Sequence, residues 1–356
     1  MSRRAPGAPP RMADVAARAG VGTITVSRAL RSPQQVSPEV RERVRAAIEA
    51  TGYVPNFAAG TLKSQRSRMV AAIVPTLRSA IFAETVDALA DGLRVRGLQL
   101  LIASSGYSVE AEESILRTLL GQQPVAVVLT GTHHAPGVRA LLRARRLPVV
   151  ETWDLADDPI DRAVGFSNRA AAREMTLALA ARGHRRIAFV GTPPGVEHRA
   201  AQRLAGYRDA MAELGLDADV EMLDDLGVSI ASGERAAQAL LARAQPPQAA
   251  FFVNDVAAFG AVQVCQRLGV DVPRGLAIAG FGDFELARAS NPPLTTVRIP
   301  GALIGATAAR LVLEGLAGGG AVAEAEGAAE AAEVVAGAAR ARCVDLGFEV
   351  ISRKSA

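Results

Sequence analysis

Residues 14–30, DVAARAGVGTITVSRAL, contain two short helical segments separated by a tight turn. Alanines give the first segment small faces, and Gly20 stands where a helix-ending glycine in the left-handed conformation belongs. Thr23 is expected to cap a second helix, whose apolar Val26 and Leu30 lie four residues apart on one face. The stretch therefore predicts a helix-turn-helix, although an ordinary helical hairpin would show the same pattern.

The opposite face of the second helix carries polar and cationic side chains, namely Thr23, Ile24, Ser27, Arg28 and Arg31. An arginine can donate two hydrogen bonds to guanine, and Ser or Thr adapts to several base edges. A short helix with an apolar back and such a front fits the major groove of DNA.

Composition limits the class of protein. The chain has 356 residues and 49% apolar content, which suits two or three domains with buried cores. Two cysteines, Cys265 and Cys343, cannot build a disulfide framework, and this suits a reducing cytosol. No apolar run reaches membrane-spanning length, and residues 1–11 lack the apolar core of a secretory signal. We therefore expect a cytoplasmic protein with no membrane partner and a disordered N-terminal arm.

Positive charge is concentrated near the N-terminus. Residues 1–68 contain twelve Lys or Arg and four Asp or Glu, a net charge of +8, so the remaining chain carries −4. A basic head on a slightly acidic body is typical of a nucleic-acid-binding module attached to a regulatory domain. An anionic lipid surface would also attract such a head, but the head lacks an amphipathic helix with aromatic anchors.

Residues 37–52, SPEVRERVRAAIEATG, predict a third helix. Ser37 is placed to cap it and Pro38 to occupy its first turn. The inward stripe is Val40, Val44 and Ile48. Arg41, Arg43 and Arg45 face outward and either contact phosphates or are simply solvated. Both alternatives stay open, because phosphate contacts carry no sequence signature.

Residues 56–68 have the composition of a conditional hinge helix. Asn56 can cap it, but the segment is too short to hold as a helix alone and needs a second subunit or a DNA groove. Leu62 is followed by Lys63 and two arginines. An apolar wedge flanked by cations is a device that opens a minor groove.

This N-terminal region resembles the head of the LacI family of bacterial repressors. The pattern is DVAxxAGV…TVSRxL, then VSxxxRxRVxxAIxxxGYxPN, then a hinge that ends in leucine. The resemblance implies that Thr23, Ile24 and Arg28 read bases, and that Leu62 pairs with its dimer mate to open the centre of a palindrome. Gly60 departs from the pattern and costs the hinge about 1 kcal/mol of helix stability. The expected DNA contacts are Thr23, Ile24, Thr25, Ser27, Arg28, Arg31, Asn56, Leu62 and Lys63.

From Met69 onward, strands alternate with helices. Apolar runs such as MVAAIVP, QLLIASS and VAVVLTG are separated by helical segments, and the pattern restarts with RRIAFVG, AAFFVND and LAIAGFGD. Alternation of this kind predicts parallel sheets covered by helices on both faces. The fold class is therefore an all-α helix-turn-helix head plus an α/β body of two doubly wound parallel-sheet subdomains.

The expected domain boundaries follow from these patterns, and the roles of the parts are those that the LacI-family resemblance implies. They are an arm at 1–11, a helix-turn-helix domain at 12–55, a hinge at 56–68 and an effector-binding and dimerisation body at 69–356. Within the body, we expect an N-subdomain at about 69–165 and 295–316 and a C-subdomain at about 166–294 with the C-terminal strand. The Ala, Glu and Gly-rich segment 317–341 is expected to be a surface insertion outside the site.

Two such halves bind small ligands in the cleft between them, at the carboxyl ends of their strands. The order of RGHRRIAFVG, RLAGYRDAM, FFVNDVAAFGAV and PPLTTVR is similar to the core of the same family, itself similar to periplasmic sugar-binding proteins. PVVETWD, AVGFSN, CQRLGVDVP and CVDLGFEV resemble the repressors of gluconate-utilisation operons. The resemblance implies a homodimer, a double-stranded operator and a sugar-acid effector such as gluconate or a phosphorylated relative.

The resemblance also suggests residues for the effector site. Arg203 matches an arginine that clamps the ligand, and a planar guanidinium suits a carboxylate or a vicinal diol. Asn254 and Asp255 end a strand at the cleft, where they can bind hydroxyls, although Asp255 can instead cap the next helix. Phe82 and Phe281 match apolar walls, but either can be plain core.

Three further residues complete the expected effector set, namely Glu151, Trp153 and Asp283. Many sugar-binding members of the family have an acid where this chain has Gly282. Its absence removes a negative charge and favours an acidic ligand, unless the adjacent Asp283 takes its place.

The sequence gives little support to catalysis. The four histidines have no metal-ligand spacing, and there is no phosphate-binding loop or dinucleotide motif. We therefore expect no cofactor and no enzymatic activity. A sugar-binding protein without a DNA role and a sugar-acid kinase or dehydrogenase are the rival classes. The sequence leaves open repression or activation, and induction or corepression.

Overall fold

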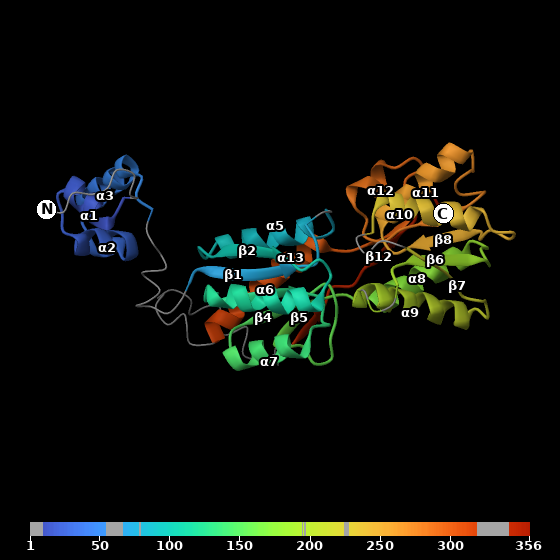
Figure 1. The fold of residues 1–356 in the computed structure, drawn as a ribbon, viewed down its shortest axis with the longest axis horizontal. Helices are drawn as coiled ribbons and strands as arrows, with labels where there is room; N and C mark the ends of the chain where they lie inside the picture. The colour runs from blue at the N-terminus through green and yellow to red at the C-terminus, as the bar shows by residue number, and fades with distance from the viewer. Residues whose placement is uncertain are drawn as a thin grey trace, which may run out of the picture. The chain divides into compact units, whose positions relative to one another are not determined.

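The computed structural model describes residues 10–54, 67–77, 80–193, 195, 197–223, 228–318 and 342–356. The chain divides into two compact units, Met1–Ser67 and Arg68–Ala356, called here the head and the body (Figure 1). Residues 1–9 of the arm, the hinge residues Asn56, Leu62 and Lys63, and the side chain of Arg31 lie outside the described residues. The same is true of residues 319–341 of the predicted insertion 317–341, whose first two residues instead belong to the helix Gly301–Gly318. The predictions made for them stay predictions.

The head contains α1 (Met12–Ala19), α2 (Thr23–Arg31), the 3-10 helix η1 (Pro33–Gln35) and α3 (Pro38–Thr51). Gly20 and Gly52 end α1 and α3 with φ values of 65° and 64°, as the glycine pattern predicts. The buried core includes Val15, Val26 and Val44. The predicted helix-turn-helix is therefore present.

Two local expectations about α2 are wrong. Gly22, in an extended conformation, occupies the N-cap, so Thr23 is the first helical residue and does not cap the helix. Leu30 is 38% exposed, whereas Ala29 packs against the core beside Val26. The inward stripe of α2 therefore has a spacing of three residues and not four.

The N-subdomain of the body contains one parallel sheet in the order β11-β5-β4-β3-β1-β2. The strands are β1 (Met69–Val74), β2 (Gln99–Ser104), β3 (Ala126–Thr130), β4 (Val149–Thr152), β5 (Arg162–Gly165) and β11 (Cys343–Asp345). The helices are η2 (Ala80–Phe82), α5 (Ala83–Arg94), α6 (Val109–Gly121), α7 (Pro136–Arg145) and α13 (Gly301–Gly318).

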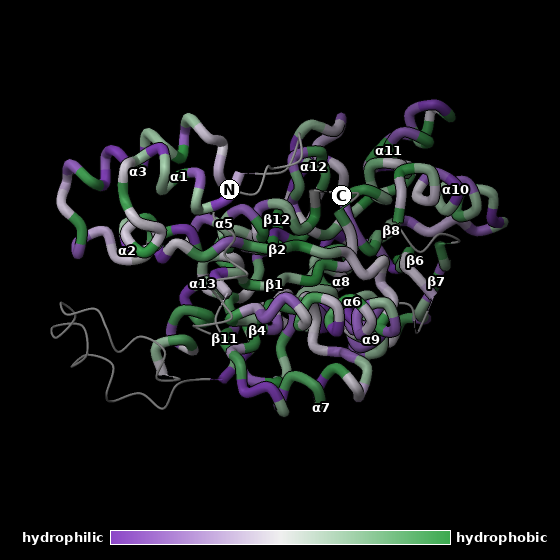
Figure 2. The backbone as a smooth tube through the Cα atoms, turned by 60° about the vertical axis from the view of Figure 1, so that its left-hand side comes forward, coloured by the Kyte–Doolittle hydropathy of each residue, from purple (hydrophilic) through white to green (hydrophobic). Residues whose placement is uncertain are grey.

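Successive side chains of β1 enter two different cores. Val70 and Ala72 join the cluster that contains Leu89 of α5, while Ala71 and Ile73 join the cluster beneath α6 and α7. This alternation is the period of a strand that is buried on both faces, and Figure 2 shows β1 as largely hydrophobic. The predicted two-sided parallel sheet is confirmed.

The C-subdomain contains a parallel sheet in the order β7-β6-β8-β9. Its strands are β6 (Ile187–Gly191), β7 (Asp219–Met222), β8 (Ala249–Phe252) and β9 (Ala277–Ala279). Its helices are α8 (Asn168–Ala181), α9 (His198–Glu213), α10 (Ile230–Leu241), α11 (Asp255–Leu268) and α12 (Glu285–Ala289). α8 packs on α9 and α10 on α11, and the two pairs cover opposite sides of the sheet in Figure 1.

The boundary between the subdomains differs from the expected one. The expected N-subdomain includes residues 295–316, but Thr295 bridges to Ala279 of β9, and β10 (Thr296–Arg298) pairs with β12 (Glu349–Ile351). The chain therefore returns to the N-subdomain after β10 and not before it. β11 pairs with β5, so the segment after the insertion begins in the N-subdomain and only β12 belongs to the C-subdomain.

The chain consequently crosses between the subdomains three times, between β5 and α8, between β10 and α13 and between β11 and β12. The first and third crossings are joined, because the amide of Leu346 donates to the carbonyl of Gly165 at 2.8 Å. Near the second crossing, the hydroxyl of Thr85 on α5 donates to the carbonyl of Gly301 at 2.8 Å.

Among the described helices, α13 alone is long and apolar enough to cross a membrane by length and composition. In the body it packs against α5, β4 and β5, and Ile304, Ala308 and Val312 are buried in the core. The apolar composition of α13 is therefore explained by its place between a sheet and another helix.

Candidate functional site

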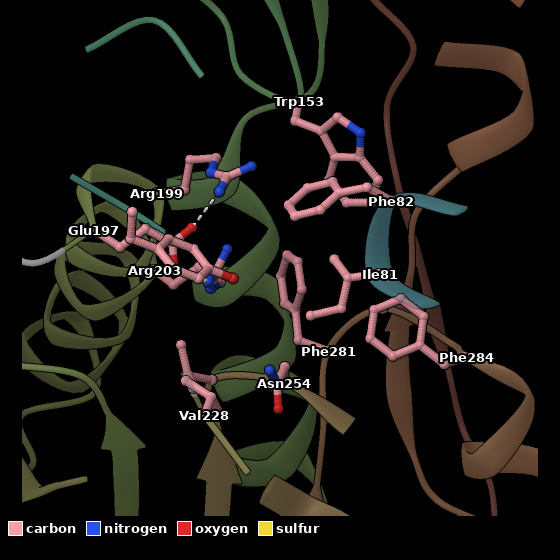
Figure 3. Close-up of a pocket in the computed structure, with 13 residues that line it drawn as sticks. Ile81, Phe82, Trp153, Glu197, Arg199, Arg203, Val228, Asn254, Phe281 and Phe284 are labelled. Atoms are coloured by element: carbon pink, nitrogen blue, oxygen red, sulfur yellow. Dashed lines mark ion pairs between the residues drawn. The ribbon is translucent and has the colours of Figure 1, made fainter. Parts of the chain in front are cut away.

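A pocket that is partly open to solvent lies where the two subdomains meet (Figure 3). The N-subdomain contributes Ile81, Phe82, Tyr107 and Trp153. The C-subdomain contributes Glu197, Arg199, Arg203, Val228, Val253, Asn254, Phe281, Gly282 and Phe284. Trp153, Val253 and Phe281 follow the ends of β4, β8 and β9, so the pocket lies at the carboxyl ends of the strands, where α/β proteins bind ligands.

A charged cluster forms one side of the pocket. Arg199 and Arg203 lie four residues apart on α9 and therefore share one face of that helix. The Arg199 guanidinium lies 2.6 Å from a carboxylate oxygen of Glu197, and that of Arg203 lies 3.8 Å from the other oxygen. The three side chains are only 6–14% exposed, so they interact in surroundings largely withdrawn from water.

Arg203 is held in place but retains an unused donor. One terminal nitrogen donates to the amide oxygen of Asn168 at 2.7 Å, and the guanidinium lies 4.8 Å from the ring centre of Phe281. Its Nε is buried and has no hydrogen-bond partner among the described residues. Burial lowers the pKa of Arg203, the direction expected for a cation that is incompletely paired. Because Nε is closed off from solvent, a ligand oxygen would supply the missing partner only after a small shift of the side chain.

Aromatic rings form the opposite side. Trp153 makes an edge contact with Phe82 at 4.9 Å between ring centres, and Arg199 lies 5.2 Å from the centre of the Phe82 ring across the cleft. Trp153 has a φ of 69°, an unfavourable value for a bulky residue. Its carbonyl accepts from Asn168 at 3.1 Å and its indole donates to Thr85 at 3.1 Å, so several bonds maintain this conformation.

The structure brings five of the eight expected effector residues to the pocket, namely Phe82, Trp153, Arg203, Asn254 and Phe281. Asn254, and not Asp255, caps α11, because its amide oxygen accepts from the backbone of Ala257 at 3.0 Å. The amide nitrogen of Asn254 then remains as the group that can donate to a ligand.

The other three expected effector residues do not line the pocket, and this corrects the sequence prediction. Glu151 is fully buried beneath α6 and α7 and accepts from the backbone of Ile160 at 2.6 Å. Asp255 is fully buried and accepts from Thr296 at 2.5 Å. Asp283 is held between arginines, among them Arg298 at 2.8 Å. Each carboxylate satisfies protein donors, so none replaces the family acid that is absent at Gly282.

Gly282 is required by the backbone. Its φ is 130°, a value that side-chain-bearing residues rarely adopt, and an added Cβ would lie 2.3 Å from the ring of Phe284. An acid at this position would therefore displace a wall of the pocket.

Sequence reasoning missed most of the charged cluster. Arg199 could have been found from its helical spacing to Arg203, and Glu197 from its place just before α9. Tyr107 comes from a loop of the other subdomain and gave no signal. Burial raises the pKa of Tyr107 to about 12, so its hydroxyl is neutral near pH 7. Within the described ranges, no three His, Cys, Asp or Glu side chains are grouped to hold a metal ion.

The environment of Asp255 makes stability pH-dependent. Burial raises the pKa of Asp255 from its ordinary value of 3.8 to about 7, despite hydrogen bonds from Thr296 and Phe284. The folded state therefore holds this proton more tightly than the unfolded state. The resulting stability is complete below about pH 4 and is lost, by at most about 1.4 kcal/mol per pH unit, as the pH rises to about 7.

Asp255→Asn is expected to remove this loss, because an amide does not ionise, and its oxygen can accept from Phe284 while its nitrogen donates to the hydroxyl oxygen of Thr296. Between pH 5 and 7, denaturant unfolding should show the variant gaining about 2 kcal/mol relative to the wild type. Asp271→Asn, a change at an exposed surface acid, is the control and should follow the wild type. Parallel pH curves for the wild type and Asp255→Asn would contradict the argument.

In the head, α2 presents the side chains that were expected to read bases. Thr23, Ile24 and Arg28 are exposed, and Thr25 and Ser27 are half-buried. Ile24 is 73% exposed, which is unusual for a large apolar side chain and leaves it available to an apolar group such as a thymine methyl. The first turn of α2 contains no acidic residue, so nothing there opposes a phosphate at its positive end.

Comparison with known proteins agrees with both units. Residues 11–56 match the family described as "Bacterial regulatory proteins, lacI family", and residues 176–338 match "Periplasmic binding protein-like domain". The HTH-type transcriptional regulator GntR of Pseudomonas aeruginosa is 36% identical over 347 residues, which are 97% of this chain and 95% of that protein.

The chain belongs to the LacI family. The regulator GntR of Escherichia coli K12 is also 36% identical, over 87% of this chain and 92% of its own length. A solved LacI-family structure from Silicibacter pomeroyi has a TM-score of 0.86 and 32% identity, and covers 98% of this chain and 99% of its own. As a LacI-family member, the chain is a ligand-responsive DNA-binding transcriptional regulator, and the predicted family and fold class are confirmed.

Proposed function

We propose that this LacI-family regulator represses genes for the use of a sugar acid such as gluconate. It binds a palindromic operator as a homodimer and leaves it when the sugar acid occupies the body. The observation that supports the effector class is the pocket itself, where Arg203 lies beside a second arginine and its buried Nε has no hydrogen-bond partner within the part of the chain that the structure describes. The GntR regulators that the chain resembles support the same class by name.

The two units supply the two halves of this function. In the head, α2 exposes Thr23, Ile24 and Arg28 for the major groove, and the family pattern assigns the minor-groove wedge to Leu62 of the hinge. In the body, the pocket is lined from both subdomains, so a ligand contacts both and favours one relative arrangement of them. Repression is relieved if, in that arrangement, the distance between the hinges of the two subunits no longer fits one operator.

The experiment is fluorescence anisotropy of a labelled palindromic fragment from the region upstream of the gene. It is titrated at one fixed salt concentration, because phosphate contacts make affinity steeply salt-dependent. Tight binding that gluconate releases would support the regulator and its effector together. Tight binding that no sugar acid alters would contradict the effector class, and an absence of specific binding would favour a sugar-binding protein with no DNA role.

Arg28→Ala is expected to weaken operator binding by about 10- to 100-fold, because a bidentate arginine contact to guanine contributes about 1–3 kcal/mol. Arg18→Ala is the matched control, since Arg18 is an exposed arginine of the same head but lies at the end of α1. Anisotropy with operator and with scrambled DNA separates the effects. If Arg28→Ala weakens both DNAs equally, Arg28 contacts phosphate and does not read bases.

Two further properties follow from this function. A bacterial transcriptional regulator acts in the cytoplasm, where the DNA is, and the relatives are named as transcriptional regulators. We infer that this chain is also a cytoplasmic regulator without enzymatic activity. Its pocket binds the effector, and binding changes the affinity for DNA. Turnover of gluconate with ATP or NAD would contradict this inference.

A further inference from the structure

The charges that line the pocket do not cancel. Arg199 and Arg203 are opposed by one lining carboxylate, Glu197, and Tyr107 is neutral near pH 7. Asp154 keeps its negative charge and acts on Arg203 electrostatically, but it is hydrogen-bonded to Thr132 and the amide of Leu155 and is not one of the lining residues. The pocket wall therefore carries a net charge of +1 among the described residues.

Glu197 determines the net charge of the pocket wall, because it lies between the two arginines and is the one carboxylate among the described lining residues. One carboxylate oxygen is 2.6 Å from Arg199 and the other is 3.8 Å from Arg203. Arg199 has its partner, whereas Arg203 is held at a longer distance and keeps a buried Nε without a partner. One cation is thus neutralised in the unliganded pocket, and the other is left for an incoming anion.

We propose that Glu197 limits the effector to a single negative charge, so that the pocket accepts an unphosphorylated polyhydroxy monocarboxylate and rejects its phosphorylated relatives. This inference rests on the sugar-acid function proposed above and specifies the class of sugar acid that the pocket accepts.

The physical reason is the cost of unbalanced charge in a buried site. A monocarboxylate beside the Arg203 guanidinium leaves the described lining of the liganded pocket close to neutral. A phosphate ester adds about 1.5 to 2 further negative charges near pH 7. Those charges would face the Glu197 carboxylate, and the described residues that line the pocket include no further cation. Glu197 keeps lone pairs that can accept from ligand hydroxyls, so it favours a polyhydroxy chain while it opposes a second anion.

The test is isothermal titration calorimetry on the full-length protein with gluconate, 6-phosphogluconate and neutral sorbitol. The wild type should bind gluconate at least tenfold more tightly than its 6-phosphate. Glu197→Gln keeps the shape and raises the wall charge to +2, so it should lower that preference at least tenfold by strengthening binding of the 6-phosphate. Glu197→Asp keeps the charge and should retain the preference of the wild type.

Glu213→Gln is the matched control, because Glu213 lies at the other end of α9 and pairs with Arg173 at the surface. It should leave all three affinities unchanged. Tighter binding of the 6-phosphate than of gluconate by the wild type would overturn the inference while leaving a sugar-acid regulator intact. An equal loss for all three ligands in Glu197→Gln would also overturn it, because Glu197 would then act through structure alone. Binding of sorbitol alone would overturn both this inference and the proposed effector class.

Discussion

Gly206→Ala is expected to destabilise the body by about 3 kcal/mol, although alanine is the better helix former. Gly206 lies on α9 where that helix crosses α8, and an added Cβ would lie 1.9 Å from the carbonyl oxygen of Arg169. The obstacle is backbone and not a flexible side chain, so the two helices must separate. Urea unfolding of the body, followed by circular dichroism, measures the loss.

Gly121→Ala is the matched control for this change. Gly121 is the last residue of α6, and an added Cβ there would meet no atom within 4 Å. Without an obstacle, the propensity effect should remain and stabilise the protein by up to about 1 kcal/mol. Opposite signs for the two glycines are the expected result, and a stabilising Gly206→Ala would show that the α8–α9 contact adapts.

The contact at Gly206 also bears on the pocket. α9 carries Arg203 and α8 begins at Asn168, and the two side chains are joined at 2.7 Å across the same interface. Separation of the helices should therefore weaken effector binding as well as stability.

Arg203→Ala is expected to weaken gluconate binding by about 100-fold, equivalent to about 2.7 kcal/mol. The variant loses the buried cation with the unpaired Nε, and charge-assisted hydrogen bonds contribute about 1.5–3 kcal/mol each. It also leaves the amide oxygen of Asn168 without its partner. In the anisotropy experiment, the operator should stay bound at gluconate concentrations that release the wild type.

Two variants make the Arg203 result specific. Arg208→Ala removes an exposed arginine from the same helix and should bind gluconate as the wild type does. Arg203→Lys keeps the charge but lacks the planar fork, so an intermediate affinity is expected. A loss of less than about threefold in Arg203→Ala would contradict the assignment of Arg203 to the anion, and thermal melts confirm that each variant is folded.

The chain order of strands and helices was predictable because apolar runs and turn residues report local structure directly. The direction of a side chain at a strand end was not. Adjacent residues of β4 enter opposite cores, so Glu151 is buried beneath α6 and α7 while Val150 contacts the other side. At the start of α11, Asn254 reaches the pocket and Asp255 turns inward, a difference set by one residue of register.

Residues that meet only through the tertiary fold were the least predictable. Tyr107 and Glu197 come from loops of different subdomains, and no local pattern connects them. Phe82 and Arg203 were found because they resemble positions of a known family, which carries long-range information that a single sequence lacks. β10 was misplaced for the same reason, because its partner β12 lies far along the chain, beyond α13 and the residues 319–341.

The three crossings limit how the two subdomains of the body can move relative to each other. Two subdomains joined by one segment can rotate about it in any direction. Subdomains joined by three segments are restricted mainly to a hinge motion, and here two of the three segments are also hydrogen-bonded to each other. Cutting any one connection leaves the subdomains attached. Residues 319–341 connect α13 to β11, and both of these elements belong to the N-subdomain. The number of residues in this segment can therefore change without altering any of the three connections.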